Sequence, residues 1–280
     1  MLFFEDKELS EVPLVVLDTE TTGLFPGMGH RVVEVAAVRL VGWREVGQMS
    51  GLVNPGRSMD PNAARVNGIS ETELATAPPF ADIVPRLQPL LEGAVLVAHN
   101  APFDAGFLGM EYAILRQNGF TLFDPVLPNP WLCTLALARK QFYFGQNSLG
   151  QVARQLGVRT GRAHRALNDV YVTAEVLKRM VQQLAQRKLR TVGDLFIAQG
   201  GPIFAPTFAN IALPSIVQEA ISGRNTLQIH YQGPGGESKR KITPLYPTEH
   251  EGIAYLVAYC HLRQEQRTFR LDRILDIIPL

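Results

Sequence analysis

Short apolar runs rich in β-branched residues recur through the first hundred positions and predict strands of a buried sheet. The predicted strands cover residues 14–17, 31–41, 45–53 and 94–98. The third run ends at Asn54-Pro55-Gly56, a sequence typical of a turn. These strands are short and closely spaced, so we expect them to lie in one sheet.

Apolar residues at helical spacing predict a series of helices, which dominate the chain after residue 100. The longest periodic stretch covers residues 165–184. The other predicted helices cover residues 80–91, 103–117, 132–140 and 148–156. Strands followed mostly by helices are typical of an α/β domain with a mixed sheet flanked by helices.

The pattern changes after residue 193, where glycines and prolines predict a linker or an ordered crossover. Apolar positions then alternate along 227–231, and further short strands are predicted over 239–243, 254–260 and 267–271. Short strands at close spacing favour a small β-barrel. We therefore expect a first domain over residues 1–185, a linker over 186–215 and a barrel domain over 216–280.

Composition and charge narrow the function classes. The chain has 280 residues, 46% hydrophobic and 19% charged, as expected of a globular protein. Its 27 basic and 26 acidic residues nearly cancel, so any nucleic-acid binding must be local. The chain has no apolar run of 18 residues, and residues 1–10 do not resemble a signal peptide. Cys133 and Cys260 have no metal-binding spacing, so we expect a reduced, cytoplasmic setting and no membrane contact.

Carboxylates follow two of the predicted strands. Asp18 and Glu20 come after the first run, and the two-residue period of a strand places them on the same side. Two carboxylates this close repel each other unless a cation lies between them. Asp104 follows the strand at 94–98. The alternatives are a polar strand end for the first pair and a helix cap for Asp104.

A third segment carries His164 and Asp169 at the start of the longest predicted helix. Each alone is also compatible with a surface residue. Taken together, the three segments place four acids and one histidine at element ends that could meet at one sheet edge. Hard oxygen ligands suit Mg²⁺ or Mn²⁺, and a histidine can take a proton from water near neutral pH. This is the equipment for phosphodiester hydrolysis.

The three segments resemble, in order and intact, the sequence motifs of the DnaQ-like (DEDDh) 3′→5′ exonucleases, a group with an RNase H-like fold. The resemblance covers roughly residues 12–185. It implies that Asp18, Glu20, Asp104 and Asp169 hold two divalent metal ions, Mg²⁺ or Mn²⁺, and that His164 is the general base. It also implies that the pocket for the 3′-terminal nucleotide is lined by Thr19, Leu24, His99, Asn100 and Phe103.

The implied reaction removes nucleoside 5′-monophosphates from single-stranded or frayed 3′ ends of DNA. The family works in bacterial DNA repair, processing and replication proofreading, so a DNA polymerase is a candidate partner. We favour a free-standing repair or processing nuclease. Two alternatives stay open: an exonuclease acting on RNA or oligoribonucleotides, and a ligand-sensing regulator whose nuclease-like domain only binds ends.

The C-terminal strands carry arginines near aromatic residues. Residues 254–260 and 267–274 resemble the WYL domain, a small Sm/SH3-like β-barrel of bacterial regulators, with Ala254 in place of the tryptophan. The resemblance implies a patch that binds nucleic acid or a nucleotide-like ligand, formed by Tyr255, Arg263, Arg267, Arg270 and Arg273. The alternative is a solvated strand face on which arginines alternate with core residues.

Overall fold

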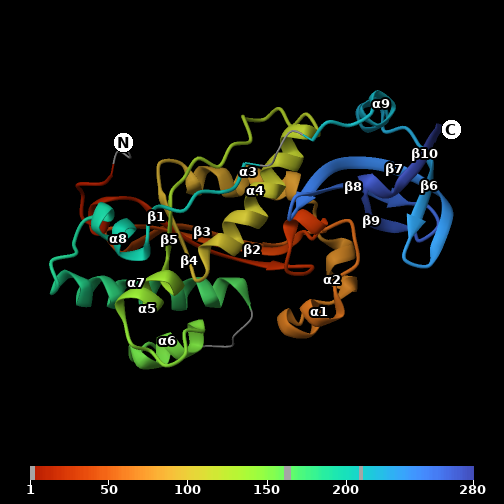
Figure 1. Cartoon of the computed structure of the whole chain (residues 1–280). Helices are drawn as coiled ribbons and strands as arrows, with labels where there is room; N and C mark the ends of the chain where they lie inside the picture. The colour runs from red at the N-terminus through yellow and green to blue at the C-terminus, as the bar shows by residue number, and fades with distance from the viewer. Residues whose placement is uncertain (1–3, 161–164, 208–210) are drawn as a thin grey trace.

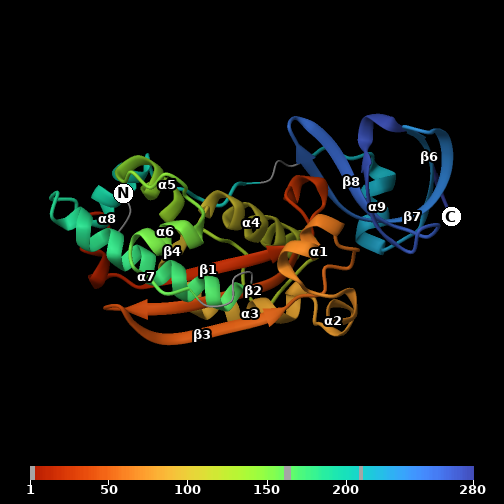
Figure 2. The same cartoon turned by 90° about the horizontal axis from the view of Figure 1, so that it is seen from below.

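Two β-sheets organise the chain, one in each half (Figures 1 and 2). The computed structural model describes residues 4–160, 165–207 and 211–280. In the first sheet the strand order is β3-β2-β1-β4-β5. The strands are β1 (Leu14–Thr21), β2 (Val32–Val41), β3 (Arg44–Leu52), β4 (Val95–Ala98) and β5 (Trp131–Cys133). β1, β2 and β3 pair antiparallel, whereas β4 and β5 run parallel to β1, so the sheet is mixed as expected.

Helices cover both faces of this sheet (Figure 1). On one face, Val15 and Leu17 of β1 pack with α3 (Phe80–Leu91) and α4 (Ala101–Gln117). On the other, Leu14 and Val16 pack against a layer formed by α5 (Thr134–Gln141), α6 (Leu149–Gln155), α7 (Ala166–Ala185) and α8 (Val192–Gln199). Burial on both faces explains why these strands are nearly uninterrupted apolar runs.

The predicted elements of this half are confirmed, with three differences. β1 extends through Thr21, so Asp18 and Glu20 lie within the strand rather than after it. The helix predicted over 132–140 begins only at Thr134, because the preceding residues form the short strand β5. Two helices not expected from the pattern, α1 (Pro61–Asn67) and α2 (Glu71–Thr76), follow β3.

The segment expected to be a linker or crossover contains the helix α8. Its residues Val192, Leu195 and Phe196 are buried in the hydrophobic core on the α7 side of the sheet, and the helix contacts α5 and β5. A capping box formed by Thr191 and Asp194 begins this helix. The first part of the segment is therefore packed against the mixed-sheet domain.

The second sheet is antiparallel, in the order β10-β6-β7-β8-β9. It consists of β6 (Leu227–Gly233), β7 (Gly236–His250), β8 (Ile253–Cys260), β9 (Glu265–Arg270) and β10 (Ile274–Pro279), and α9 (Ser215–Gly223) packs against it. Among the described residues no pairing joins β9 to β10, so the closed barrel is not confirmed. The sequence did not predict β10, and β7 is longer than the strand predicted over 239–243.

The two sheets lie side by side in both views, and β7 and β8 approach α4 and the loop after β1 (Figure 2). A small apolar cluster joins Met110 and Ile114 of α4 to Tyr246 and Val257 of the second sheet. The two halves therefore share a packed interface. No helix in the described residues is both long and apolar enough to cross a membrane.

Candidate active site

Three carboxylates meet where β1 ends beside the start of α7. Oxygen atoms of Asp18, Glu20 and Asp169 all lie within 4.8 Å of one another. Asp18 and Glu20 share one side of β1 through the two-residue period, and Asp169 lies in the first turn of α7. The predicted convergence of the first and third segments is thus present in the structure.

Asp104 on α4 lies near enough for its charge to act on Asp18, and it is held by Thr19, the residue of β1 between Asp18 and Glu20. Thr19 donates two hydrogen bonds to Asp104 Oδ1, from its backbone N–H at 3.0 Å and from Oγ1 at 2.8 Å. Because Thr19 points to the opposite side from its neighbours in the strand, its hydroxyl faces α4. The sequence suggested Thr19 as a residue of the nucleotide pocket, and the structure shows in addition that it holds Asp104.

Burial and mutual repulsion raise the pKa values of these acids. Burial, followed by the charge of Asp104, raises the pKa of Asp18 well above its usual range. Burial and the charge of Glu34 raise the pKa of Glu20 to about 7, and burial raises that of Asp104 to about 7. Ionised carboxylates gathered this closely need compensating positive charge. The cluster therefore fits divalent cations, which bind oxygen ligands.

Glu34 is a site residue that the motifs did not reveal. It lies on β2 directly opposite Glu20, and only 4% of its surface is exposed to solvent. Its carboxylate accepts a hydrogen bond from the backbone N–H of Ala166 at 3.3 Å and pairs with Arg165 at 3.3 Å. Glu34 thus anchors the N-terminus of α7, which carries Asp169. One acid inside the apolar run 31–41 was the sequence signal for it.

A pocket of about 350 Å³ opens beside the acidic cluster. It lies between the loop after β1 and the helices α1 and α4. Leu24 and Phe103 line it, as the sequence suggested. The residues that line it also include Glu20, Phe25, His30 and Asn67. A carboxylate of the acidic cluster and apolar side chains therefore face the same space.

His30 is another residue of the pocket that the motifs missed. Its Nδ1 lies 3.0 Å from Thr22 Oγ1, and Thr22 also accepts a hydrogen bond from the backbone N–H of Arg31. Burial, followed by the charge of Arg57, lowers the pKa of His30 to about 4. The imidazole is therefore neutral at pH 7 and offers a polar but uncharged wall.

The segment before α4 places its two polar residues differently. His99 has both ring nitrogens engaged, with Thr134 Oγ1 and the backbone carbonyl of Asn147, each at 2.9 Å. His99 thereby connects the end of β4 to the start of α5 and to the residue that precedes the N-cap of α6. Asn100 is exposed and begins α4 with a left-handed backbone, at φ 81°. His164 lies outside the described residues.

Two of the C-terminal arginines form ion pairs with neighbouring carboxylates. Arg267 pairs with Glu265 at 2.9 Å, and Arg270 pairs with Asp272 at 2.6 Å. Tyr255 is buried opposite Arg270 in the β8–β9 pairing. Arg263 lies in the exposed turn after β8, and Arg273 in the 3-10 helix η3 (Leu271–Arg273). Neighbouring carboxylates thus offset the positive charge of two of the four arginines, Arg267 and Arg270.

A mixed sheet covered by helices, with acids gathered at the end of its central strand, is the RNase H-like architecture of nucleases. The chain belongs to the exonuclease family, whose family model matches residues 15–177. A second family model, the WYL domain, matches residues 213–279. Both resemblances noted in the sequence are confirmed.

Named relatives agree with this assignment. The chain is 41% identical over 198 residues to a DNA polymerase III subunit epsilon-like protein of Rhodobacter capsulatus, covering 67% of this chain and 27% of the relative. It is 36% identical over 171 residues to the DNA polymerase III subunit epsilon of Rickettsia felis, covering 60% and 73%. The chain spans only about a quarter of the Rhodobacter protein's length.

Solved structures share the fold. Exonuclease X in complex with 5′ overhanging duplex DNA superposes with a TM-score of 0.52 at 30% identity, covering 67% of this chain and 99% of that one. Exonuclease I of E. coli in complex with single-stranded DNA gives 0.52 at 16% identity, covering 88% and 54%. At that identity the second likeness concerns the fold alone.

Proposed function

We propose that the protein is a metal-dependent 3′→5′ exonuclease that hydrolyses the terminal phosphodiester bond of single-stranded DNA and releases nucleoside 5′-monophosphates. The observation that carries this proposal is the set of oxygens from Asp18, Glu20 and Asp169 within 4.8 Å, beside a pocket of about 350 Å³. The family membership and the exonuclease X likeness support the same chemistry.

In this proposal Asp18, Glu20, Asp104 and Asp169 hold two divalent ions, Mg²⁺ or Mn²⁺. When bound, such ions stabilise the charge that develops on the attacking and leaving oxygens of a phosphoryl displacement. Thr19 keeps Asp104 oriented through its two hydrogen bonds. Glu34 fixes the start of α7 and hence Asp169. His164 removes a proton from the attacking water.

The pocket would receive the 3′-terminal nucleotide. Leu24 and Phe103 supply apolar surface against the base, while Glu20 faces the end where the phosphodiester would lie. A neutral His30 adds a polar wall without repelling a cation. A duplex end would have to fray before its last nucleotide could enter, so single strands should be preferred.

The wider assignment also forms part of the proposal. We place the exonuclease domain at residues 1–185, a connecting segment at 186–215 and a WYL-like domain of Sm/SH3 type at 216–280, with a nucleotide-like ligand or nucleic acid as its partner. The bacterial relatives and the two free cysteines favour a bacterial cytoplasmic protein. DNA repair or processing is the favoured role, with proofreading beside a polymerase as the alternative.

The test is digestion of a 5′-labelled single-stranded DNA oligomer with Mg²⁺ or Mn²⁺. We expect a ladder that shortens from the 3′ end, disappears with EDTA and is lost in Asp18→Ala and Asp169→Ala. Asp82→Ala, which changes an exposed aspartate on α3, is the matched control and should behave as the wild type. Full activity of Asp18→Ala would overturn the metal assignment. A faster reaction on the matched RNA oligomer would change the substrate to RNA.

A further inference from the structure

One wall of the proposed nucleotide pocket is the loop after β1. Leu24 and Phe25 line the pocket and are nevertheless 69% and 49% exposed. The short 3-10 helix η2 (Pro26–Met28) follows them at once. Two exposed apolar side chains on a loop need support from behind to keep a fixed shape.

The second sheet supplies that support. The ring of Phe25 lies 4.8 Å, centroid to centroid, from the ring of His250, at the tip of the β7–β8 hairpin. Thr268 on β9 donates a hydrogen bond from Oγ1 to the backbone carbonyl of Met28 at 2.9 Å. The C-terminal domain therefore holds both ends of the segment Phe25–Met28.

Gly27 allows a close approach between the backbones of the two domains. A Cβ atom at this position would overlap the backbone carbonyl oxygen of Glu249, which belongs to the same hairpin. Backbone atoms cannot turn away as a flexible side chain can. Any side chain at Gly27 must therefore move the hairpin and the pocket wall apart.

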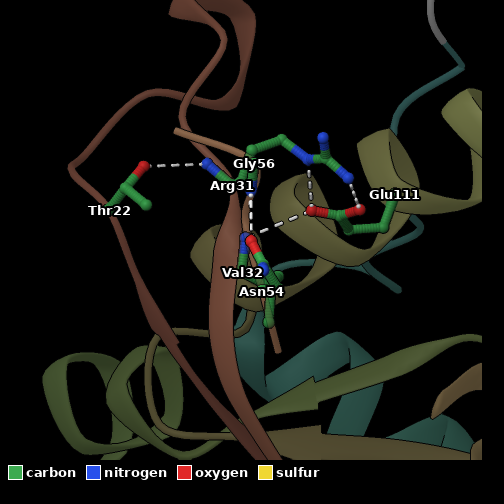
Figure 3. A network of polar contacts seen from close by, with 6 residues as sticks. All are labelled: Thr22, Arg31, Val32, Asn54, Gly56 and Glu111. Carbon is green, nitrogen blue, oxygen red and sulfur yellow. Dashed lines mark hydrogen bonds and ion pairs between the residues drawn. The ribbon is translucent and has the colours of Figure 1, made fainter. Parts of the chain in front are cut away.

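The same interface is fixed more deeply by a buried ion pair. Arg31 follows the loop and pairs with Glu111 of α4, and its guanidinium carbon lies 5.9 Å from the centroid of the Tyr246 ring (Figure 3 shows the ion pair). Tyr246 and Val257 also pack on Met110 and Ile114. The hairpin is thus seated on the exonuclease domain at its base as well as at its tip.

We propose that the β7–β8 hairpin of the C-terminal domain is part of the substrate-binding site, with His250 as a positioning residue that holds Phe25 and Leu24 against the 3′-terminal nucleotide. This rests on the proposed exonuclease function. It gives the C-terminal domain a role in the affinity for single-stranded 3′ ends, exerted through the pocket wall. That role is separate from any ligand of its arginines.

The charge of the hairpin supports positioning rather than contact with phosphates. Glu249 and Glu251 are exposed on either side of His250. Carboxylates at the tip repel a phosphate backbone, so the tip itself is unsuited to grip the strand. Its contribution must pass through the ring contact with Phe25 and the close approach at Gly27.

The test compares full-length His250→Ala, His250→Phe and Gly27→Ala for binding and cleavage of a single-stranded DNA oligomer. Binding of a 5′-fluorescein oligomer is measured by anisotropy in EDTA and in Ca²⁺, so it does not depend on turnover. Loss of the supporting ring should raise Kd and KM roughly tenfold, in the range of one lost aromatic contact with a base. We expect kcat to change less than KM. His250→Phe, which keeps a ring, should restore most of the affinity.

Gly235→Ala is the matched control, because a Cβ at Gly235 meets nothing within 4 Å. It should keep the wild-type Kd, KM and thermal midpoint. Wild-type Kd and KM in both His250→Ala and Gly27→Ala would overturn the positioning role. A failure of the wild type to cleave would instead count against the exonuclease function, while the Kd comparison would still decide the role of the hairpin.

Discussion

Arg31 and Glu111 form a buried, two-pronged ion pair that joins the loop after β1 to α4. Arg31 donates from Nε to Glu111 Oε1 at 2.8 Å and from Nη2 to Oε2 at 2.6 Å (Figure 3). Glu111 also accepts the backbone N–H of Val32 at 3.2 Å. Burial opposes the charge of Arg31, yet its pKa is raised because Glu111 lies so close. The pair lies where the two domains meet.

Glu111→Ala should destabilise the protein strongly. The substitution leaves the guanidinium of Arg31 buried without its partner, a change that typically costs about 3–5 kcal/mol. Urea unfolding of the full chain measures the effect. Glu92→Ala, at an exposed position after α3, is the control and should change the midpoint little. A loss below about 1 kcal/mol in Glu111→Ala would mean that water replaces the carboxylate.

Thr19→Val should weaken metal activation without changing the fold. Valine keeps the shape of threonine but removes the hydroxyl that donates to Asp104 at 2.8 Å. A hydrogen bond to a charged group contributes about 1.5–3 kcal/mol, so the Mn²⁺ concentration for half-maximal cleavage should rise roughly tenfold or more. Thr76→Val, which loses only an exposed bond to the backbone of Glu73, serves as control. An unchanged Mn²⁺ dependence in Thr19→Val would mean that the hydrogen bond from Thr19 to Asp104 does not contribute to metal binding.

The stability of the metal-free protein should fall as the pH rises. Glu20 has its pKa raised from 4.5 to about 7, and Asp104 from 3.8 to about 7, mainly by burial. A carboxyl group with a higher pKa in the folded state binds more protons when folded. Stability is therefore lost as the pH rises from the ordinary carboxyl pKa of 3.8–4.5 to the folded-state value of about 7. Bound cations offset the repulsion between the ionised groups.

The corresponding measurement is urea unfolding with EDTA and with Mn²⁺, at about pH 5 and about pH 8. The stabilisation by Mn²⁺ should be larger at the higher pH, where the free carboxylates are ionised. Asp18→Asn removes one of the repelling charges and should shrink this difference. Equal stabilisation at both pH values would contradict the assignment of the cluster as a cation site.

Glu34→Ala should lower turnover more than substrate binding. The carboxylate holds the backbone N–H of Ala166 and the side chain of Arg165 at the start of α7. Without it, Asp169 loses the fixed helix end on which it lies, and kcat should fall roughly tenfold, as for one lost charged hydrogen bond. Glu34→Gln retains an acceptor oxygen and should fall less. Equal values of kcat in Glu34→Ala and the wild type would show that Glu34 does not position Asp169 for the reaction.

The sequence by itself determined most of the strands and helices around the site and the chemistry of the central strand. Runs such as Val32–Val41 identify their own strands, because a strand buried on both faces is a short, nearly continuous run of apolar residues. The two-residue period of a strand placed Asp18 and Glu20 together, and the motif resemblance singled out Asp104 and Asp169. Local pattern failed for β5 and β10, which have three and six residues and little alternation.

Only the tertiary structure decided what supports these groups. Thr19 meets Asp104 across 85 positions of sequence, and Glu34 meets Ala166 across 132. Phe25 and His250 come from different domains. Such contacts depend on how separate elements pack, and packing is set by the summed shape and burial of whole faces rather than by any local period. The carboxylates could therefore be found in the sequence, whereas the residues that hold them and the pocket wall in place emerged only from the fold.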